Sequence, residues 1–203
     1  MINLKKFLAL ILIAGLFALS FGESKAFAQG NILVAYFSRT GEEYSVGNIT
    51  KGNTNIIAEI IAQKTGGSLF EIKPVKNYPV NYKECTKIAS SEKASKARPA
   101  LANQVENFGA YDVIFVGYPI WYGDMPMPVY TFLESYDFGG KTIIPFCTHG
   151  GSGLSSTDQQ ITLTCPTAKL LRGFEIRGSV AQKDFNQAES KVVEWLKKIG
   201  MTN

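Results

Sequence analysis

The sequence predicts an α/β domain built on a parallel sheet with helices on both faces. Apolar runs of strand length at 31–38, 111–117 and 142–147 are continuous rather than alternating, which is typical of strands buried on both faces. Between them lie segments with helical periodicity, and this alternation indicates a parallel sheet. Glycine pairs at 66–67 and 139–140 mark two of the turns between elements.

Ten elements follow from this pattern. In chain order they are strand 31–38, helix 55–64, strand 68–72, helix 82–96, strand 111–117, helix 126–136, strand 142–147, helix 155–163, strand 168–177 and helix 184–199. The first and last helices have the clearest apolar faces, with Ile57 near Ile60 and Ile61, and Val192 near Leu196. Prolines interrupt the pattern between 73 and 107, and the fifth strand is irregular.

The N-terminus has the pattern of a signal peptide. Lys5 and Lys6 precede an apolar stretch over 7–21, which is short for a membrane span, and residues 26–28 form a small-x-small cleavage site. We expect residues 1–28 to be cleaved, leaving a domain over 29–203 that is exported, either secreted or periplasmic, with no stable membrane insertion. The alternative is an uncleaved membrane anchor.

Charge and cysteine content exclude several classes of protein. Without residues 1–28, the chain has 18 basic and 16 acidic residues, a net charge of +2, so nucleic-acid binding is not expected. The stretch 83–98 is locally basic and is interpreted as a solvated helix face. Cys85, Cys147 and Cys165 have no metal-site spacing, so no metal is expected, and no disulfide is predicted.

The loop between the first strand and the first helix has the composition of a phosphate site. Hydroxyl groups can donate to phosphate oxygens, glycine allows close backbone approach, and a helix N-terminus favours an anion. The candidate residues are Ser38, Arg39, Thr40, Gly41, Asn53 and Thr54. Alternatively, this is an ordinary turn and helix cap, with Arg39 facing solvent. The loop is neither a Walker loop nor a G-x-G-x-x-G loop.

Two further loops leave the sheet after the third and fourth strands. Ligands of open parallel sheets bind beyond the carboxyl ends of the strands. The aromatic pair in the first loop either walls a planar ligand or packs on a helix, and the histidine in the second either contacts the ligand or is structural. The candidates are Pro119, Ile120, Trp121, Tyr122 and Gly123 in the first loop and Thr148, His149, Gly150, Gly151 and Gly153 in the second.

The sequence YFSRTG at 36–41, followed by GNT at 52–54, resembles the phosphate signature of flavodoxins. The resemblance covers roughly 31–196 and implies flavin mononucleotide (FMN) as cofactor and a flavodoxin-like, doubly wound sheet of five parallel strands in the order 2-1-3-4-5. It also implies flavin contacts from the two later loops. An insertion at 42–51 splits the signature and leaves open which of Thr40, Asn53 and Thr54 touches phosphate. Tyr44 and Asn48 in the insertion either fold over the ligand or decorate the surface.

The resemblance implies an FMN-binding electron-transfer protein with an unidentified redox partner protein, as a monomer or homodimer. The alternative is an FMN-dependent NAD(P)H oxidoreductase of the quinone reductase type, because the same fold hosts such enzymes. A third hypothesis is a non-redox ligand-binding protein. Flavodoxins are usually acidic, whereas this chain is slightly basic, so its partner surface is expected to differ from theirs.

Overall fold

The computed structural model describes residues 31–202, and the predicted signal peptide at 1–28 lies outside them. The strands are β1 (Ile32–Tyr36), β2 (Gly41–Glu43), β3 (Gly47–Ile49), β4 (Ser68–Glu71), β5 (Val113–Pro119), β6 (Thr142–His149), β7 (Lys169–Leu170) and β8 (Phe174–Arg177). The helices are α1 (Asn53–Thr65), α2 (Tyr82–Ser95), α3 (Met127–Glu134), α4 (Thr157–Thr164), α5 (Gly178–Lys183) and α6 (Phe185–Lys198), with a 3₁₀ turn at Phe108–Ala110.

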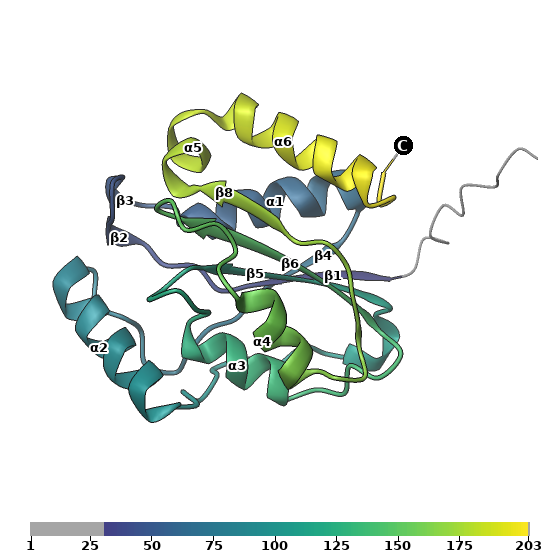
Figure 1. The fold of residues 1–203 in the computed structure, drawn as a ribbon, viewed down its shortest axis with the longest axis horizontal. Coiled ribbons are helices and arrows are strands. Elements are labelled where there is room, and N and C mark those ends of the chain that lie inside the picture. Colours follow the sequence, from purple (N-terminus) through teal and green to yellow (C-terminus); the bar gives the residue numbers. More distant parts are fainter. Residues whose placement is uncertain (1–30, 203) are drawn as a thin grey trace, which may run out of the picture.

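The main sheet is parallel and has the predicted strand order. β1 lies between β4 and β5, β6 follows β5, and β7 and β8 both pair with the outer side of β6. This is the order 2-1-3-4-5 when β7 and β8 count as the fifth strand, so the prediction is confirmed. All carboxyl ends therefore reach one edge of the sheet, where the β2–β3 hairpin and α2 also lie (Figure 1).

The fifth strand was predicted as one piece, and the structure corrects this. β7 ends opposite Ile143 and β8 begins opposite Phe146, so the ladder is broken beside Pro145. Proline has no N–H to donate to a neighbouring strand. The ladder between β5 and β6 continues through Pro145, so its missing donor interrupts only the outer side.

The last helical segment also differs from the prediction, because two helices occupy 178–198 instead of one beginning at 184. α5 ends at Lys183, and Asp184 then caps α6 by accepting a hydrogen bond from the backbone N–H of Gln187 at 2.9 Å. An Asp at this position starts a helix well. The sequence therefore marked where α6 begins but not the short helix before it.

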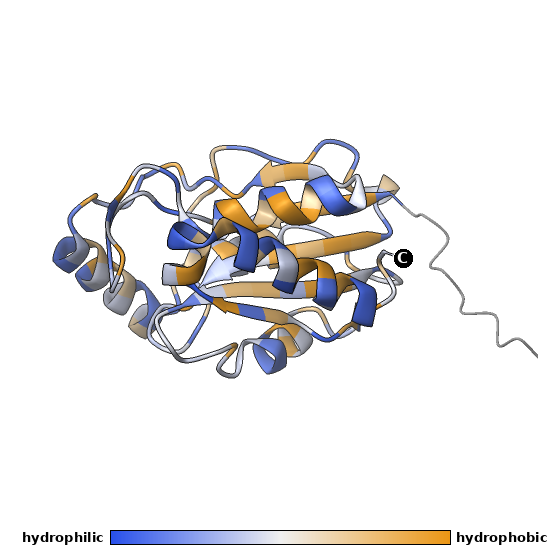
Figure 2. Ribbon diagram, turned by 90° about the horizontal axis from the view of Figure 1, so that it is seen from above, coloured by the Kyte–Doolittle hydropathy of each residue, from blue (hydrophilic) through white to orange (hydrophobic). Residues whose placement is uncertain are grey.

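Helices cover both faces of the sheet. α1, α5 and α6 lie on one face and α3 and α4 on the other (Figure 1). Side chains of β5 alternate between the two cores, with Phe115 on the α1 side and Ile114 on the α3 side. Figure 2 shows the hydrophobic strands beneath helices with hydrophilic outer faces. Within residues 31–202, no helix is long and apolar enough to span a membrane.

Buried thiol and phenol groups make the folded protein less stable at alkaline pH. Burial raises the pKa of the Cys85 and Cys165 thiols from 9.0 to about 11 and that of Tyr36 from 10.0 to about 12. Above pH 9 the unfolded chain loses protons that the folded chain retains, so the free energy of unfolding falls as pH rises. We expect urea denaturation to show no contribution from these groups below pH 8 and a steady loss of stability from pH 9 to 11.

A Cys85→Ala/Cys165→Ala variant provides the control for this alkaline loss. The stability of the variant at each pH is compared with its own urea midpoint at pH 7, because the substitutions themselves alter packing. The decline of its stability above pH 9 should be shallower than that of the unaltered protein. A free energy of unfolding that stays constant from pH 8 to 10.5 would contradict the expected pKa changes.

Candidate functional site

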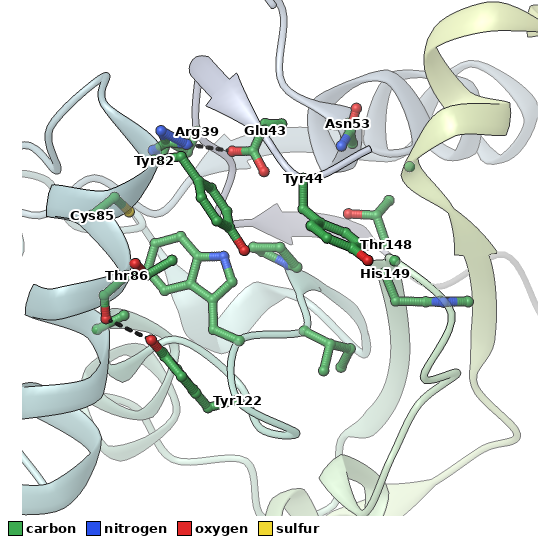
Figure 3. A pocket seen from close by; sticks show the side chains of 16 residues that line it. Arg39, Glu43, Tyr44, Asn53, Tyr82, Cys85, Thr86, Tyr122, Thr148 and His149 are labelled. Atoms are coloured by element: carbon green, nitrogen blue, oxygen red, sulfur yellow. Dashed lines mark hydrogen bonds and ion pairs between the residues drawn. The ribbon is translucent and has the colours of Figure 1, made fainter. Parts of the chain in front are cut away.

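A cavity of about 340 Å³ opens at the carboxyl edge of the sheet, between α1, α2 and the loops after β5 and β6 (Figure 3). Nine of the predicted site residues line it: Arg39, Asn53, Pro119, Ile120, Trp121, Tyr122, Thr148, His149 and Gly150. Seven lie outside the lining: Ser38, Thr40, Gly41, Thr54, Gly123, Gly151 and Gly153. The structure thus brings all three predicted loops to one pocket.

The insertion leaves the phosphate loop as a separate hairpin, and the two halves of the signature meet again beneath it. Residues 41–43 and 47–49 pair as the antiparallel strands β2 and β3. A Cβ atom placed on Gly52 would stand 2.0 Å from Ser38 Oγ and 2.6 Å from the carbonyl oxygen of Arg39. Only glycine allows this approach, so Gly52 closes the gap that the insertion opens in the sequence.

The N-terminus of α1 presents free donors at the pocket. The first N–H groups of a helix have no acceptor within it, and that of Asn55 donates to Ser38 Oγ at 3.1 Å. Those of Asn53 and Thr54 have no acceptor within residues 31–202, and the first turn of α1 contains no acidic residue. This helix start therefore fits an anion such as a phosphate group.

Asn53 and Thr54 have different positions at this helix start. Asn53 lines the pocket, and its Oδ1 is buried without a hydrogen-bond partner among the described residues. An amide can donate to phosphate oxygens or accept from a ligand hydroxyl, so the residue fits a phosphorylated ligand. Thr54 is buried, and its hydroxyl lies 2.8 Å from that of Thr148, which ties the phosphate loop to the loop after β6.

The guanidinium group of Arg39, predicted to contribute charge to the phosphate site, is instead occupied by protein acceptors. It donates to Glu43 Oε1 at 2.6 Å and to the backbone oxygens of Glu42, Pro79 and Val80 at 2.8 to 3.2 Å. Burial is the main influence on the Glu43 carboxyl and raises its pKa, while the bond from Arg39 opposes this rise. Arg39 thus clamps the hairpin to the segment before α2.

The remaining residues of the first loop have structural positions. Gly41 has φ +103°, a left-handed conformation that favours glycine, and a Cβ there would stand 2.6 Å from the carbonyl oxygen of Val80. Thr40 is exposed and outside the pocket lining. Of the residues left open by the split signature, Asn53 is therefore the one whose side chain reaches the cavity.

The loop after β5 forms a tight turn whose aromatic residues have two roles. Trp121 and Asp124 exchange backbone hydrogen bonds at 2.9 and 3.0 Å, and Tyr122 and Gly123 both have positive φ, as in a type I′ turn. The Trp121 ring packs edge-on against Phe37, with centroids 5.4 Å apart. Trp121 therefore lines the pocket and packs on Phe37, which directly follows β1, and not on a helix as the alternative interpretation expected.

Helix α2 contributes a wall that the sequence analysis missed. Tyr82, Cys85, Thr86 and Ala89 line the cavity from one face of this helix. Their spacing of three and four residues is the signal that could have found this face. The phenol group of Tyr122 donates to the backbone oxygen of Thr86 at 3.1 Å, which joins α2 to the turn after β5.

Three other lining residues were also absent from the predicted site: Glu43, Tyr44 and Gly178. A Cβ on Gly150 would stand 2.8 Å from the Tyr44 ring, so the hairpin tip closes over the loop after β6. The two rings of Tyr44 and Tyr82 are 6.5 Å apart. Tyr44 therefore takes the position over the pocket, whereas Asn48 is exposed and lies outside the lining.

The imidazole of His149 points away from the centre of the pocket towards β8 (Figure 3). Its Nδ1 accepts a hydrogen bond from the backbone N–H of Gly151 at 2.9 Å, and its Nε2 pairs with the carboxylate of Glu175. Both ring nitrogens are thus occupied, and the proton lies on Nε2 because Nδ1 accepts. This arrangement favours the structural role that the sequence left open for His149.

Comparison with known proteins gives two levels of similarity. The chain resembles candidate flavoproteins from Bacteroides eggerthii (33% identity, TM-score 0.67) and Bacteroides uniformis (32%, 0.67), covering 83% of this chain and 97% and 98% of theirs. A flavoprotein in complex with FMN from Lactobacillus acidophilus is 19% identical, with a TM-score of 0.59 and coverage of 82% and 98%, and shows a shared fold. The comparison with curated proteins finds no match.

The family model gives the most direct assignment. A model described as flavodoxin matches residues 31–198, which is nearly the whole of the described chain. This range includes both halves of the split phosphate signature and the two later loops of the pocket. The chain belongs to the flavodoxin family.

Proposed function

We propose that this protein binds FMN in the pocket at the carboxyl edge of its sheet and exchanges electrons with a partner protein. One observation carries this proposal. The two halves of the phosphate loop meet at Ser38 and Gly52, and the unpaired N–H groups at the start of α1 then face the cavity. Family membership supports FMN as cofactor, and so does FMN in the Lactobacillus flavoprotein.

In this proposal, different residues of the three loops and the hairpin bind the phosphate and the flavin ring. The N–H groups of Asn53 and Thr54 hold the phosphate, and the Thr54–Thr148 contact fixes two of the loops relative to each other. Trp121 and Tyr44 border the flavin ring and exclude water from its apolar parts. When bound, FMN supplies the electron-transfer chemistry, and the protein sets its orientation.

A second candidate is an FMN-dependent NAD(P)H oxidoreductase of the quinone reductase type. The side chains of Tyr44 and Tyr122 at the pocket mouth are more than half exposed. A planar substrate could approach the flavin between them, which an enzyme of this type requires. The same opening would also serve direct contact with a protein partner, so the two functions need a kinetic test.

The test begins with purified protein reconstituted with FMN under anaerobic conditions. Bound FMN should appear as a shifted visible absorption spectrum with quenched flavin fluorescence. Addition of NADH or NADPH should leave the flavin oxidised for minutes, whereas dithionite reduces it at once. Reduction by NADH or NADPH within seconds would establish the oxidoreductase instead. Protein that remains colourless in excess FMN would favour a non-redox ligand-binding role.

Export is a separate part of the proposal and rests on the pattern of residues 1–28. Mass spectrometry of the protein from the extracytoplasmic fraction should show a mature chain that begins near residue 29. A full-length chain in the membrane fraction would show that the N-terminus acts as an anchor.

A further inference from the structure

Positive charge in this protein is concentrated in one segment beside the pocket. Residues 73–98 contain seven Lys or Arg and two Glu, a net charge of +5. All other residues from 29 to 203 together have a net charge of −3. The slight overall excess of basic residues therefore conceals a larger local one, and the part of it that is not paired with acidic residues is what an approaching molecule meets.

Three of these seven basic residues pair with acidic residues outside the segment, Lys73 with Glu71, Lys93 with Asp124 and Arg98 with Glu134, whereas two lysines of α2 have no such partner. Lys83 and Lys87 on α2 are exposed and have no ion-pair or hydrogen-bond partner for their ammonium groups among the described residues. Elsewhere, acidic residues neutralise lysines locally, as in the pair of Lys64 and Glu189 at 2.6 Å. The unpaired charges on α2 thus retain their full long-range field, subject to screening by salt.

These charges lie at the rim of the pocket. Lys83 and Lys87 are one helical turn apart and follow directly after Tyr82 and Thr86, which line the cavity. α2 stands at the carboxyl edge of the sheet, where the cavity opens (Figure 1). A molecule that approaches the pocket mouth therefore meets the basic side of α2.

Large apolar side chains are exposed on the same rim. Tyr44, Val80 and Tyr122 are 64%, 68% and 55% exposed. Arg39 ties the hairpin of Tyr44 to Val80, and Tyr122 is tied to α2, so these side chains are held around one opening. Exposed apolar groups beside unpaired charges are typical of a protein-binding surface.

We propose that the docking face, formed by Lys83, Lys87, Tyr44, Val80 and Tyr122, binds an acidic redox partner protein. This inference rests on the proposed function, because it requires FMN in the adjacent pocket. The lysines steer an acidic surface to the pocket mouth, and the apolar side chains then contact it close to the flavin. The charge arrangement is opposite to that expected for an acidic flavodoxin with a basic partner.

Two inorganic oxidants of opposite charge test the field at the pocket mouth. FMN-loaded protein is reduced with dithionite, freed of excess reductant, and mixed with ferricyanide, a trianion, or hexaammineruthenium(III), a trication. Each oxidant takes one electron, so two are reduced per flavin, and the flavin protons pass to water. Flavin absorbance should show a rate that falls with ionic strength for ferricyanide and rises for the ruthenium complex.

Charge reversal on α2 supplies the matched comparison. Lys83→Glu/Lys87→Glu should lower the ferricyanide rate at low ionic strength by about tenfold and reverse its salt dependence. Lys197→Glu/Lys198→Glu makes the same change of charge at the far end of α6 and should leave the rate within about twofold of the unaltered protein. Circular dichroism of each variant checks that it is folded. Poly-L-glutamate should slow the ferricyanide reaction of the unaltered protein and of the α6 variant, but not that of the α2 variant.

Three results would overturn the inference. The first is a ferricyanide rate that responds neither to salt nor to the α2 substitutions. The second is an equal response to both double substitutions, which would reflect net charge alone. The third is an absence of inhibition by poly-L-glutamate, which would indicate that the docking face attracts a small anionic substrate and not an acidic protein. Protein that does not retain FMN would instead overturn the proposed function and this inference with it.

Discussion

Replacement of Gly52 by alanine is expected to cause the largest loss of FMN binding among the substitutions considered. The new methyl group would meet Ser38 Oγ at 2.0 Å and a backbone oxygen at 2.6 Å. The backbone oxygen cannot turn aside as a flexible side chain can, so the two halves of the phosphate loop must separate. Overpacking of this kind costs about 1–3 kcal/mol in stability, and we expect FMN to bind at least about tenfold more weakly.

The measurement is FMN titration by fluorescence quenching, together with urea denaturation of the apoprotein. Gly109→Ala is the matched control, because a Cβ at that position meets nothing within 4 Å. It should leave both affinity and stability unchanged. Wild-type affinity in Gly52→Ala would show that the close approach of Ser38 and Gly52 is not needed to hold FMN.

Asn53→Asp is expected to separate recognition of the phosphate from recognition of the flavin. Asp has nearly the same shape as Asn, but its negative charge would face the phosphate at the N-terminus of α1. Repulsion of this kind is worth about 3 kcal/mol at an effective dielectric of about 20, which corresponds to more than about 100-fold weaker FMN binding. Riboflavin, which lacks the phosphate, should bind this variant and the unaltered protein equally.

The apoprotein of Asn53→Asp should be as stable as the unaltered protein or slightly more so, because a carboxylate in the first turn of a helix is favourable. Misfolding would then not account for the loss of FMN. Asn48→Asp adds the same charge on the exposed β3 strand and serves as the control. Equal losses for FMN and riboflavin would place the phosphate elsewhere.

Most of the fold followed from the sequence because its signals are local. The apolar runs that became β1, β5 and β6 predicted a parallel sheet, since strands buried on both faces need continuous apolar residues. The broken fifth strand was not predicted, because its cause, Pro145, lies on a neighbouring strand about 25 residues earlier. A proline gives no indication in sequence of which neighbour loses a hydrogen bond.

The residues of the three loops were predicted from the sequence. What was not predicted is which partners some of them have in the folded chain. Serine, threonine, asparagine and glycine at a strand-to-helix junction identify an anion site by their chemistry alone. Arg39 was assigned from its charge, but its acceptors are the Glu43 carboxylate and backbone oxygens as far along the chain as Val80. Likewise, the partner of His149 is Glu175 on another strand. The residue type predicts which interactions a side chain can make, whereas its actual partner depends on which segments the fold brings together.

The sequence by itself determined the parallel sheet, its order through resemblance, and the three loops that carry the pocket. Only the tertiary structure decided how Ser38 and Gly52 meet across the insertion, and that α2 and Tyr44 complete the pocket. The physical reason is the sequence separation over which each signal acts. Hydrophobic periodicity and turn chemistry act between residues close in the chain. Contacts between distant segments arise only when the sheet brings its carboxyl ends to one edge.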